Sequence, residues 1–254
     1  MAEIDAVHCL ECNKATRDVR IKALGYRKIN QISIGHLLPA GQTLKPTLCV
    51  SDTHLLPVRK TYGADSPTEL QQLLEQVPDF QIFILGDFIE SLPLSRKEIG
   101  QLERSPRIGA LLDLLKFGFG TKLILGNHDI HVTSQLKNIF GSRVFPGGFR
   151  IGRLVFIHGH EIGLDASGFV ERMPNVIAFG GALGRLGVGV PFGVATNEAV
   201  AAHYRVLGLY PIFGHTHVPV VSDAFANTGC FLSTYRSFIT IENNLLALWD
   251  CENL

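Results

Sequence analysis

Five short groups of histidine, carboxylate and amide side chains could bind metal ions. They are Asp52-Thr53-His54, Gly86-Asp87, Gly126-Asn127-His128-Asp129, His158-Gly159-His160 and Gly214-His215-Thr216-His217. Oxygen donors mixed with imidazole nitrogens, and no thiolate among them, suit Mn²⁺, Fe or Zn²⁺ rather than a structural thiolate site. Two such ions about 3.5–4 Å apart can hold a phosphoryl group and ionise a bridging water. These residue types therefore predict hydrolysis of a phosphate ester or anhydride.

In the first and the last of the five groups, the spacing of the ligand types suits one shared ion. In an extended segment residues i and i+2 point to the same side, so Asp52 with His54, and His215 with His217, can each present two ligands to one ion. The glycine before a group, such as Gly214, lets the backbone turn sharply there. A single histidine of this kind is more often an ordinary core or surface residue, so the prediction depends on all five groups together.

The segments between these groups have the pattern of buried strands alternating with amphipathic helices. Strands are predicted at Thr47 to Val50, Phe80 to Leu85 and Lys122 to Leu125. A capping box at Ser66-Pro67-Thr68-Glu69 begins the first helix, whose apolar stripe is Leu70, Leu73, Leu74 and Val77. The second helix has the stripe Ile108, Leu111, Leu112 and Leu115. The order βαβαβ predicts an α/β layered domain.

Two hairpins are predicted in the second half of the chain. Phe149 to Ile151 and Leu154 to Ile157 flank the turn Gly152-Arg153. Phe238 to Glu242 and Leu245 to Trp249 flank the turn Asn243-Asn244. The second half of the chain is therefore expected to contain antiparallel sheet.

Taken in order, the five groups resemble a known family. The motifs Asp-x-His, Gly-Asp-x-x-Glu, Gly-Asn-His-Asp, His-Gly-His and Gly-His-x-His are similar to those of the calcineurin-like metallophosphoesterases, over about Cys49 to Asn227. The resemblance implies a four-layer α/β sandwich of two mixed sheets flanked by helices. It implies one ion held by Asp52, His54, Asp87 and His217, and a second held by Asp87, Asn127, His158 and His215, with Asp87 bridging. Mn²⁺ is the expected ion, with Fe and Zn²⁺ as the other candidates.

The same resemblance implies roles for the remaining polar residues of the motifs. His128 would face the phosphate as an electrostatic stabiliser or as the general acid for the leaving oxygen, and Glu90 would orient it. Asp129 would support its loop. His160 is left with two roles, a metal ligand or a residue that lines the site.

The second motif, Gly-Asp-x-x-Glu, also indicates which branch of the family the chain resembles. Protein Ser/Thr phosphatases of this superfamily carry Arg-Gly after its acid, whereas Glu90 here is followed by Ser91-Leu92. Glu90, together with the insertion between His158 and His215, is more similar to the bacterial UDP-2,3-diacylglucosamine diphosphatase-like group. The best-known members of that group have arginine where His128 stands. A lipid-linked or nucleotide-diphosphate substrate follows from this likeness.

The insertion, at about residues 164–205, is apolar and rich in glycine. Between Phe169 and Ala195, Arg185 is the only charged residue after Arg172. One interpretation is a helical lid packed on the core. The other is an apolar cap that receives acyl chains or rests on a membrane surface, with Arg185 meeting a phosphate, which would account for the mean hydropathy of +0.21.

Composition limits the class of partner and the compartment. Basic and acidic residues balance at 23 each, so no global field draws the protein to nucleic acid. The first residues lack the pattern of a secretory signal peptide, and the five cysteines are odd in number, so a cytoplasmic location, peripheral to a membrane, is expected without a structural disulfide. Residues 1–45 are expected to be an N-terminal extension and residues 46–254 the catalytic domain.

Three alternatives stay open. A nuclease or phosphodiesterase acting on nucleic acid or cyclic nucleotides would need a basic groove, and only the N-terminal extension concentrates positive charge. A non-catalytic scaffold of the same fold would have lost ligands, whereas all seven ligand positions here hold competent residues. The pair Cys9 and Cys12 could bind zinc with His8 and His36, or be an inert reduced pair.

Overall fold

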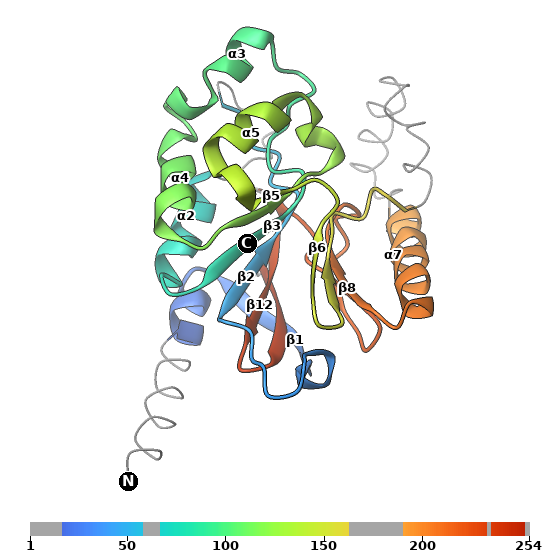
Figure 1. Cartoon of the computed structure of the whole chain (residues 1–254). Coiled ribbons are helices and arrows are strands. Elements are labelled where there is room, and N and C mark those ends of the chain that lie inside the picture. The colour runs from blue at the N-terminus through green and yellow to red at the C-terminus, as the bar shows by residue number, and fades with distance from the viewer. Residues whose placement is uncertain (1–16, 58–66, 163–189, 233–234, 252–254) are drawn as a thin grey trace.

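The computed structural model describes residues 17–57, 67–162, 190–232 and 235–251, with side chains of the last helix from Thr196 onward. Two β-sheets pack face to face, and helices cover the outer face of each (Figure 1). This is the expected α/β arrangement of two mixed sheets with flanking helices, which is confirmed. The pair Cys9 and Cys12, Arg185 and residues 163–189 of the expected lid lie outside the described residues.

The first sheet has eight strands, and its parallel half carries the first three metal-capable groups. Its order is β1 (Tyr26–Ser33), β13 (Leu245–Cys251), β12 (Tyr235–Glu242), β2 (Thr47–Val50), β3 (Gln81–Leu85), β4 (Lys122–Ile124) and β5 (Val144–Phe145), with β11 (Phe231–Leu232) paired to β12. Strands β2 to β5 run parallel, whereas β12, β13 and β1 are antiparallel to their neighbours.

The second sheet has five strands and carries the other two groups. Its order is β6 (Phe149–Ile151), β7 (Leu154–Phe156), β8 (Tyr210–Phe213), β10 (Ala226–Asn227) and β9 (Val220–Val221). Strands β7, β8 and β10 are parallel, and both edge strands are antiparallel. The two predicted hairpins are confirmed as β6–β7 and β12–β13, and Asn243 and Asn244 both have positive φ as a tight hairpin turn requires.

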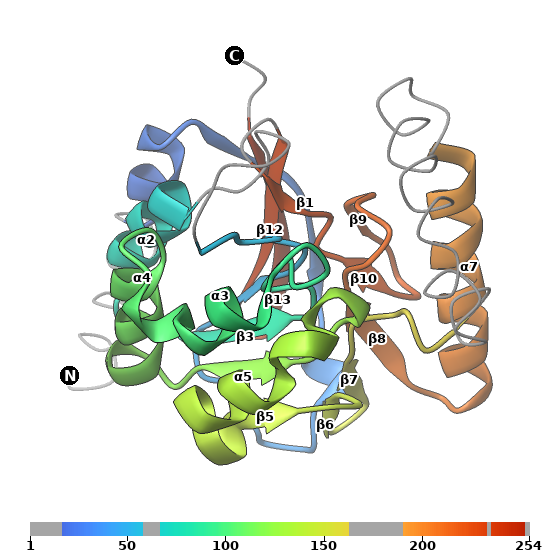
Figure 2. The ribbon, with the colours of Figure 1, turned by 90° about the horizontal axis from the view of Figure 1, so that it is seen from above.

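Helices form the two outer layers, which are separated most clearly in Figure 2. Those beside the first sheet are α2 (Pro67–Gln76), α3 (Arg96–Gly100), α4 (Gly109–Asp113) and α5 (Thr133–Phe140), whereas α7 (Val190–Val206) lies beside the second sheet. A π-helical turn, Leu114–Gly118, continues α4. Short 3-10 helices lie at Gly35–Leu37, Leu102–Arg104, Asn127–Val132 and Gly141–Arg143.

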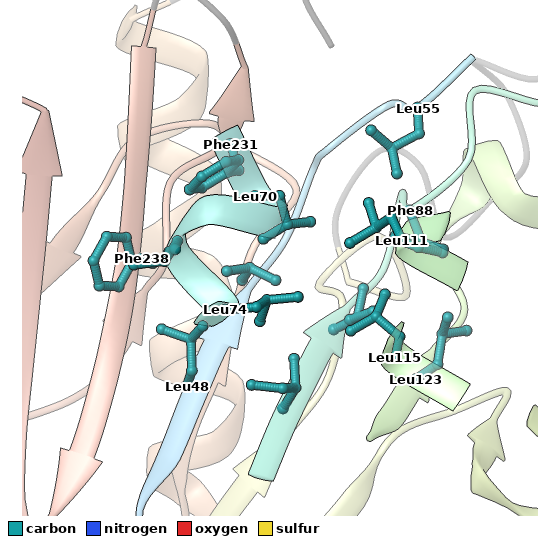
Figure 3. Close-up of a cluster of buried hydrophobic side chains, with 14 of the residues drawn as sticks. Leu48, Leu55, Leu70, Leu74, Phe88, Leu111, Leu115, Leu123, Phe231 and Phe238 are labelled. Atoms are coloured by element: carbon teal, nitrogen blue, oxygen red, sulfur yellow. The ribbon is translucent and has the colours of Figure 1, made fainter. Parts of the chain in front are cut away.

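The alternation of side chains along the strands divides the core into layers. Ile82 and Ile84 of β3 belong to the same buried cluster as the leucines of α2 and α4. Figure 3 shows part of this cluster, including Leu70 and Leu74 of α2 and Leu111 of α4. Phe83 and Leu85, one residue on, point to the other face and pack with Phe156 of the second sheet. A strand that is apolar on both faces therefore sits between two layers, which is why its sequence is a continuous apolar run.

The first sheet begins before residue 46, the predicted start of the domain. Strand β1 pairs with β13 along its length and forms one edge of the eight-stranded sheet. Arg17 forms ion pairs with Asp79 and Glu242, which ties the residues before β1 to the sheet and to the loop after α2. Part of the expected N-terminal extension therefore belongs to the domain, because a mostly polar edge strand lacks the apolar run that marks a central strand.

The described end of the expected lid is a helix packed on the core. Val200 and Ala201 of α7 are fully buried against Val155, Ile157 and Phe213 of the second sheet. Residues from Val190 to Val206 therefore form the fourth layer of the sandwich. In the part of the chain that the structure describes, no helix is both long and apolar enough to cross a membrane.

Candidate metal centre

The five groups meet where the parallel strands of both sheets end. Each group directly follows a strand, namely β2, β3, β4, β7 or β8. Because these strands are parallel within each sheet, their carboxyl ends lie at one edge, and packing of the two sheets brings the two edges together. Sequence reasoning placed the groups on strand ends, and the packing of one sheet on the other places them in one site.

The first cluster consists of Asp52, His54 and His217, whose ligand atoms lie within 4.8 Å of one another. Oδ1 of Asp52 lies 3.1 Å from Nε2 of His217 and 4.0 Å from Nε2 of His54. Asp52 is fully buried, and its other oxygen, Oδ2, accepts the backbone N–H of His215 at 2.8 Å. One carboxylate oxygen is therefore held by the backbone, and the other faces two imidazoles.

The second cluster consists of Asp87, His158 and His215. Oδ2 of Asp87 lies 3.3 Å from Nε2 of His158, whose Nδ1 lies 2.8 Å from the carbonyl oxygen of Leu85. Both Asp87 and His158 are buried. The same Oδ2 lies 3.9 Å from Nε2 of His54, so the Asp87 carboxylate stands between the two clusters.

The local backbone differs from the extended geometry that the spacing predicts. Asp52, His54, Asp87, His215 and His217 all have positive φ, between 43° and 67°. His215 and His217 belong to different clusters, as the ligand sets implied by the resemblance have it, whereas Asp52 and His54 share one cluster. Non-glycine residues at positive φ cost free energy and gather at functional sites. Among the described residues, only the turn residues Asn243 and Asn244 share this feature.

At Gly126 and Gly214 there is no room for a side chain larger than hydrogen. A Cβ at Gly126 would overlap the carboxylate of Asp87, and a Cβ at Gly214 would overlap Ser51 and Asp52. Gly86, before Asp87, has positive φ, whereas Gly126 and Gly214 do not, and the chain turns just after Gly214, where the N–H of Thr216 donates to the Gly214 carbonyl at 2.8 Å. The backbone of Gly126 and Gly214 comes very close to the carboxylates, which only glycine permits.

The donor atoms of the two clusters fit divalent cations. Oδ1 of Asp52, Nε2 of His54, Oδ1 of Asn127 and Nε2 of His158 are all buried from water without a hydrogen-bond partner. Buried polar atoms are normally paired, so four unpaired atoms in one place indicate a missing ligand. Imidazole nitrogens and carboxylate and amide oxygens are donors for Mn²⁺, Fe or Zn²⁺. The arrangement can therefore hold metal ions.

Glu90 connects the candidate metal cluster to His128. Its carboxylate lies 2.9 Å from Nδ1 of His128 and 3.0 Å from Nδ1 of His54. The contact with His128 was predicted, and the contact with His54 was not. The backbone N–H of His128 donates to Oδ1 of Asp87 at 2.9 Å, and Ser91 donates a hydrogen bond to the His128 carbonyl. His128 is thus fixed at three points beside the first cluster.

Replacing Glu90 by glutamine is expected to weaken the orientation of both His54 and His128. The amide cannot accept a hydrogen bond from two imidazoles with a full negative charge, so His54 and His128 both lose orientation. We expect metal affinity to fall roughly 10–100-fold, the usual loss for an outer-shell partner of a metal-ligating histidine. Isothermal titration with Mn²⁺ measures this, and Glu98→Gln, a change in the α3 capping box, is the matched control. Unchanged affinity would contradict the role.

When no ion is bound, the pKa of Asp52 is lowered and the pKa values of His54 and His158 are raised. Burial would raise the pKa of Asp52, but the nearby charge of His217, whose Nε2 lies 3.1 Å from Oδ1, holds it at about 2. Burial would lower the pKa of His54, but the Glu90 hydrogen bond and the charges of Asp87 and Asp52 raise it to about 9. The pKa of His158 rises to about 10 against its burial, chiefly through Asp87. In the metal-free protein these imidazoles therefore carry protons at neutral pH.

Metal binding is expected to release protons. A ligating imidazole must be neutral, so binding at pH 7 should displace about two protons, one each from His54 and His158. Because protons compete with the ion, metal affinity should rise with pH up to the pKa values of the two histidines. Titration calorimetry in buffers of different ionisation enthalpy measures the release. An apparent enthalpy independent of the buffer would show that these histidines do not take part.

Polar residues outside the two clusters support the loops of the site. Asp129 was predicted from the sequence, whereas Asn227 and Asn197 were not, because they are ordinary polar residues. Asp129 supports its loop as expected, accepting the backbone N–H groups of Phe88, Ile89 and Gly126. On the other side, Asn227 donates to the carbonyl of Gly214 and to the side chain of Asn197 in α7. Asn197 was assigned to the lid, and only the packing of α7 reveals that it steadies the loop of His215.

Comparison with known proteins identifies the family. Residues 45–219, more than half of the chain, match the family described as calcineurin-like phosphoesterase. The chain belongs to this family, whose members are metallophosphoesterases. The resemblance in the five motifs is thereby confirmed at the level of the family, and the fold and the metal-capable clusters agree with it.

Solved structures give a more distant likeness. One is a protein of unknown function from Aquifex aeolicus, 17% identical, with a TM-score of 0.36, covering 70% of this chain and 82% of that chain. Another is a metallophosphoesterase from Sphaerobacter thermophilus, 13% identical, with a TM-score of 0.38, covering 82% of this chain and 88% of that chain. No curated protein matches the chain. The assignment accordingly rests on the family match and on the site.

Proposed function

We propose that this protein is a binuclear-metal-dependent hydrolase of phosphate ester or pyrophosphate bonds. The observation that carries the proposal is the position of Asp87, whose Oδ2 lies 3.3 Å from Nε2 of His158 and 3.9 Å from Nε2 of His54. A buried carboxylate between two clusters of metal-capable side chains supports a ligand that two ions would share. Loss of ligands would favour the scaffold alternative, and all seven expected positions hold residue types that can bind metal.

The proposed ligand sets follow the two clusters. Asp52, His54, Asp87 and His217 would hold one ion, and Asp87, Asn127, His158 and His215 would hold the other. Bound divalent ions supply electrophilic stabilisation of phosphoryl oxygens and lower the pKa of water. We propose Mn²⁺ as the ion, because the donors combine hard oxygens with imidazoles.

We propose that His128 acts on the phosphate or on the leaving oxygen, and its surroundings support this role. Its ring lies 4.7 Å from that of His54, beside the first cluster, and its Nδ1 is fixed by Glu90. Burial would lower the pKa of His128, but the hydrogen bond to Glu90 and the charge of Asp87 raise it. A protonated imidazole can stabilise negative charge on the phosphate or donate a proton as the ester oxygen leaves.

The finer proposal concerns the substrate. Glu90 in the second motif and the apolar composition of residues 169–195 support a lipid-linked or nucleotide-diphosphate substrate, such as UDP-2,3-diacylglucosamine. That apolar segment could also make peripheral contact with a membrane. A nuclease would need a basic groove, and the balance of 23 basic and 23 acidic residues gives it no general support.

The test is hydrolysis by the full chain loaded with Mn²⁺, compared with the same protein in EDTA. The substrates are p-nitrophenyl phosphate, bis(p-nitrophenyl) phosphate and UDP-2,3-diacylglucosamine. Metal-dependent release of product from any of them supports the phosphoesterase. Cleavage of the small esters alone would reject the lipid nucleotide, and inactivity on all three with Mn²⁺, Fe²⁺ and Zn²⁺ would favour the scaffold.

A further inference from the structure

A second imidazole–carboxylate pair lies beside the second cluster. His160 places Nδ1 3.7 Å from Oε1 of Glu161. The ring of His160 is 5.3 Å from that of His158 and 6.4 Å from that of His215. The pair of His128 and Glu90 lies beside the first cluster, and Asp87 stands between the clusters. The site therefore has an oriented histidine on each side.

Glu161 is held so that one oxygen faces His160. Its Oε2 accepts the backbone N–H of Gly159 at 2.9 Å, which fixes the carboxylate. Oε1 of Glu161 and Nδ1 of His160 are buried from water and have no hydrogen-bond partner. Leaving such atoms unpaired is costly, and a movement of less than about 1 Å would join them in an ordinary hydrogen bond. Glu161 is therefore placed to orient the ring of His160.

The nitrogen that remains available on His160 is then Nε2. The other site histidines follow the same rule, because Nδ1 of His54, His128 and His158 lies 3.0, 2.9 and 2.8 Å from an oxygen acceptor. Among the described residues, His160 belongs to neither of the two clusters, nor to the third set of side chains close enough to share an ion, His54, Glu90 and His128. Its side chain is 24% exposed, whereas that of His158 is 0% exposed. An oriented, reachable imidazole outside the metal clusters has the character of a substrate contact.

We propose that His160, oriented by Glu161, contacts the substituent that stays on the phosphoryl group, so that the site takes phosphates with two substituents, diesters or diphosphates. This inference rests on the proposed phosphoesterase function. His128 lies on the side of the first cluster and serves the leaving oxygen, whereas His160 lies on the side of the second. A phosphate monoester has no second substituent to meet His160, so the contact favours doubly substituted substrates.

The test compares two esters with the same leaving group. Bis(p-nitrophenyl) phosphate and p-nitrophenyl phosphate both release p-nitrophenolate and differ in the second substituent. In the Mn²⁺-loaded full chain, His160→Ala should lower kcat/KM for the diester roughly 10-fold, mainly through KM, the upper range for losing a hydrogen bond to an uncharged group. Activity on the monoester should change less than about 3-fold. Glu161→Gln should show a smaller loss of the same kind, and exposed His36→Ala should show none.

Metal content and the unfolding temperature are measured on each variant. Unchanged metal content with a selective loss of diester activity supports the inference. An equal loss on both esters, or a loss of bound metal, would overturn it and make His160 a metal ligand or a structural residue. A wild-type protein that cleaves only the monoester would also overturn it while leaving the phosphoesterase standing. A wild-type protein inactive on both esters would reject the proposed function itself.

Discussion

Asp87→Asn is expected to abolish hydrolysis of every phosphoester that the protein accepts. The carboxylate is buried and stands between the two clusters, within 3.9 Å of imidazoles from each. An amide offers one oxygen and no negative charge, so it cannot serve both clusters. Loss of a mere outer-shell partner costs up to about 100-fold, so loss of a shared ligand should cost at least that much. Turnover of bis(p-nitrophenyl) phosphate with Mn²⁺ measures it.

Metal content distinguishes this loss from unfolding. The Asp87→Asn protein should bind fewer than two ions by elemental analysis while keeping a cooperative thermal transition. Asp113→Asn, the same change at an exposed position in α4, is the matched control and should retain wild-type activity and metal content. A fully active Asp87→Asn protein would show that the two clusters are not a catalytic centre.

His128→Ala is expected to keep the metal ions and lose most of the rate. His128 is close enough to His54 and Glu90 to share an ion, but it lies in neither of the two proposed ligand sets, so its removal leaves Asp52, His54 and His217 in place. It also removes the imidazole that Glu90 and Asp87 hold beside the first cluster. We expect kcat to fall by roughly 10²–10⁴, the usual contribution of a positioned general acid.

The control for His128 lies three residues further along the same loop. His131 is exposed, and the contact of this residue with Ser91 is made through its backbone N–H. His131→Ala should therefore leave kcat, KM and metal content unchanged. A His128→Ala protein with wild-type kcat, or one that has lost its metal ions, would each contradict the role proposed for His128.

The results for Asp87→Asn and His128→Ala together show whether His128 is a separate acid or a metal ligand. Loss of rate in both variants, with metal lost only from Asp87→Asn, indicates a metal centre with a separate acid. Loss of metal from both indicates that His128 belongs to the ligand shell. The variants of His160 and Glu161 then address the opposite side of the site, where selectivity for the substituents of the phosphate is expected to lie.

The sequence alone predicted the parts of the fold that depend on local pattern. Apolar runs located β2, β3 and β4, the stripes of leucines located α2 and α4, and the turn residues located both hairpins. The structure confirms these elements because periodicity and turn chemistry act over a few residues. The polar strand β1 was missed because it is an edge strand whose place comes from its pairing with β13, more than 200 residues away.

For the site, the sequence by itself determined which residues could bind metal, because ligand chemistry belongs to the residue type and recurs after each strand. Residue spacing did not show how these residues divide, and the resemblance supplied that division. Tertiary structure places His215 and His217 in different clusters and Asp87 between the clusters. The orientation of His160 by Glu161 likewise depends on packing. The physical reason is that distances between strand ends are set by how two sheets pack, which no local pattern encodes.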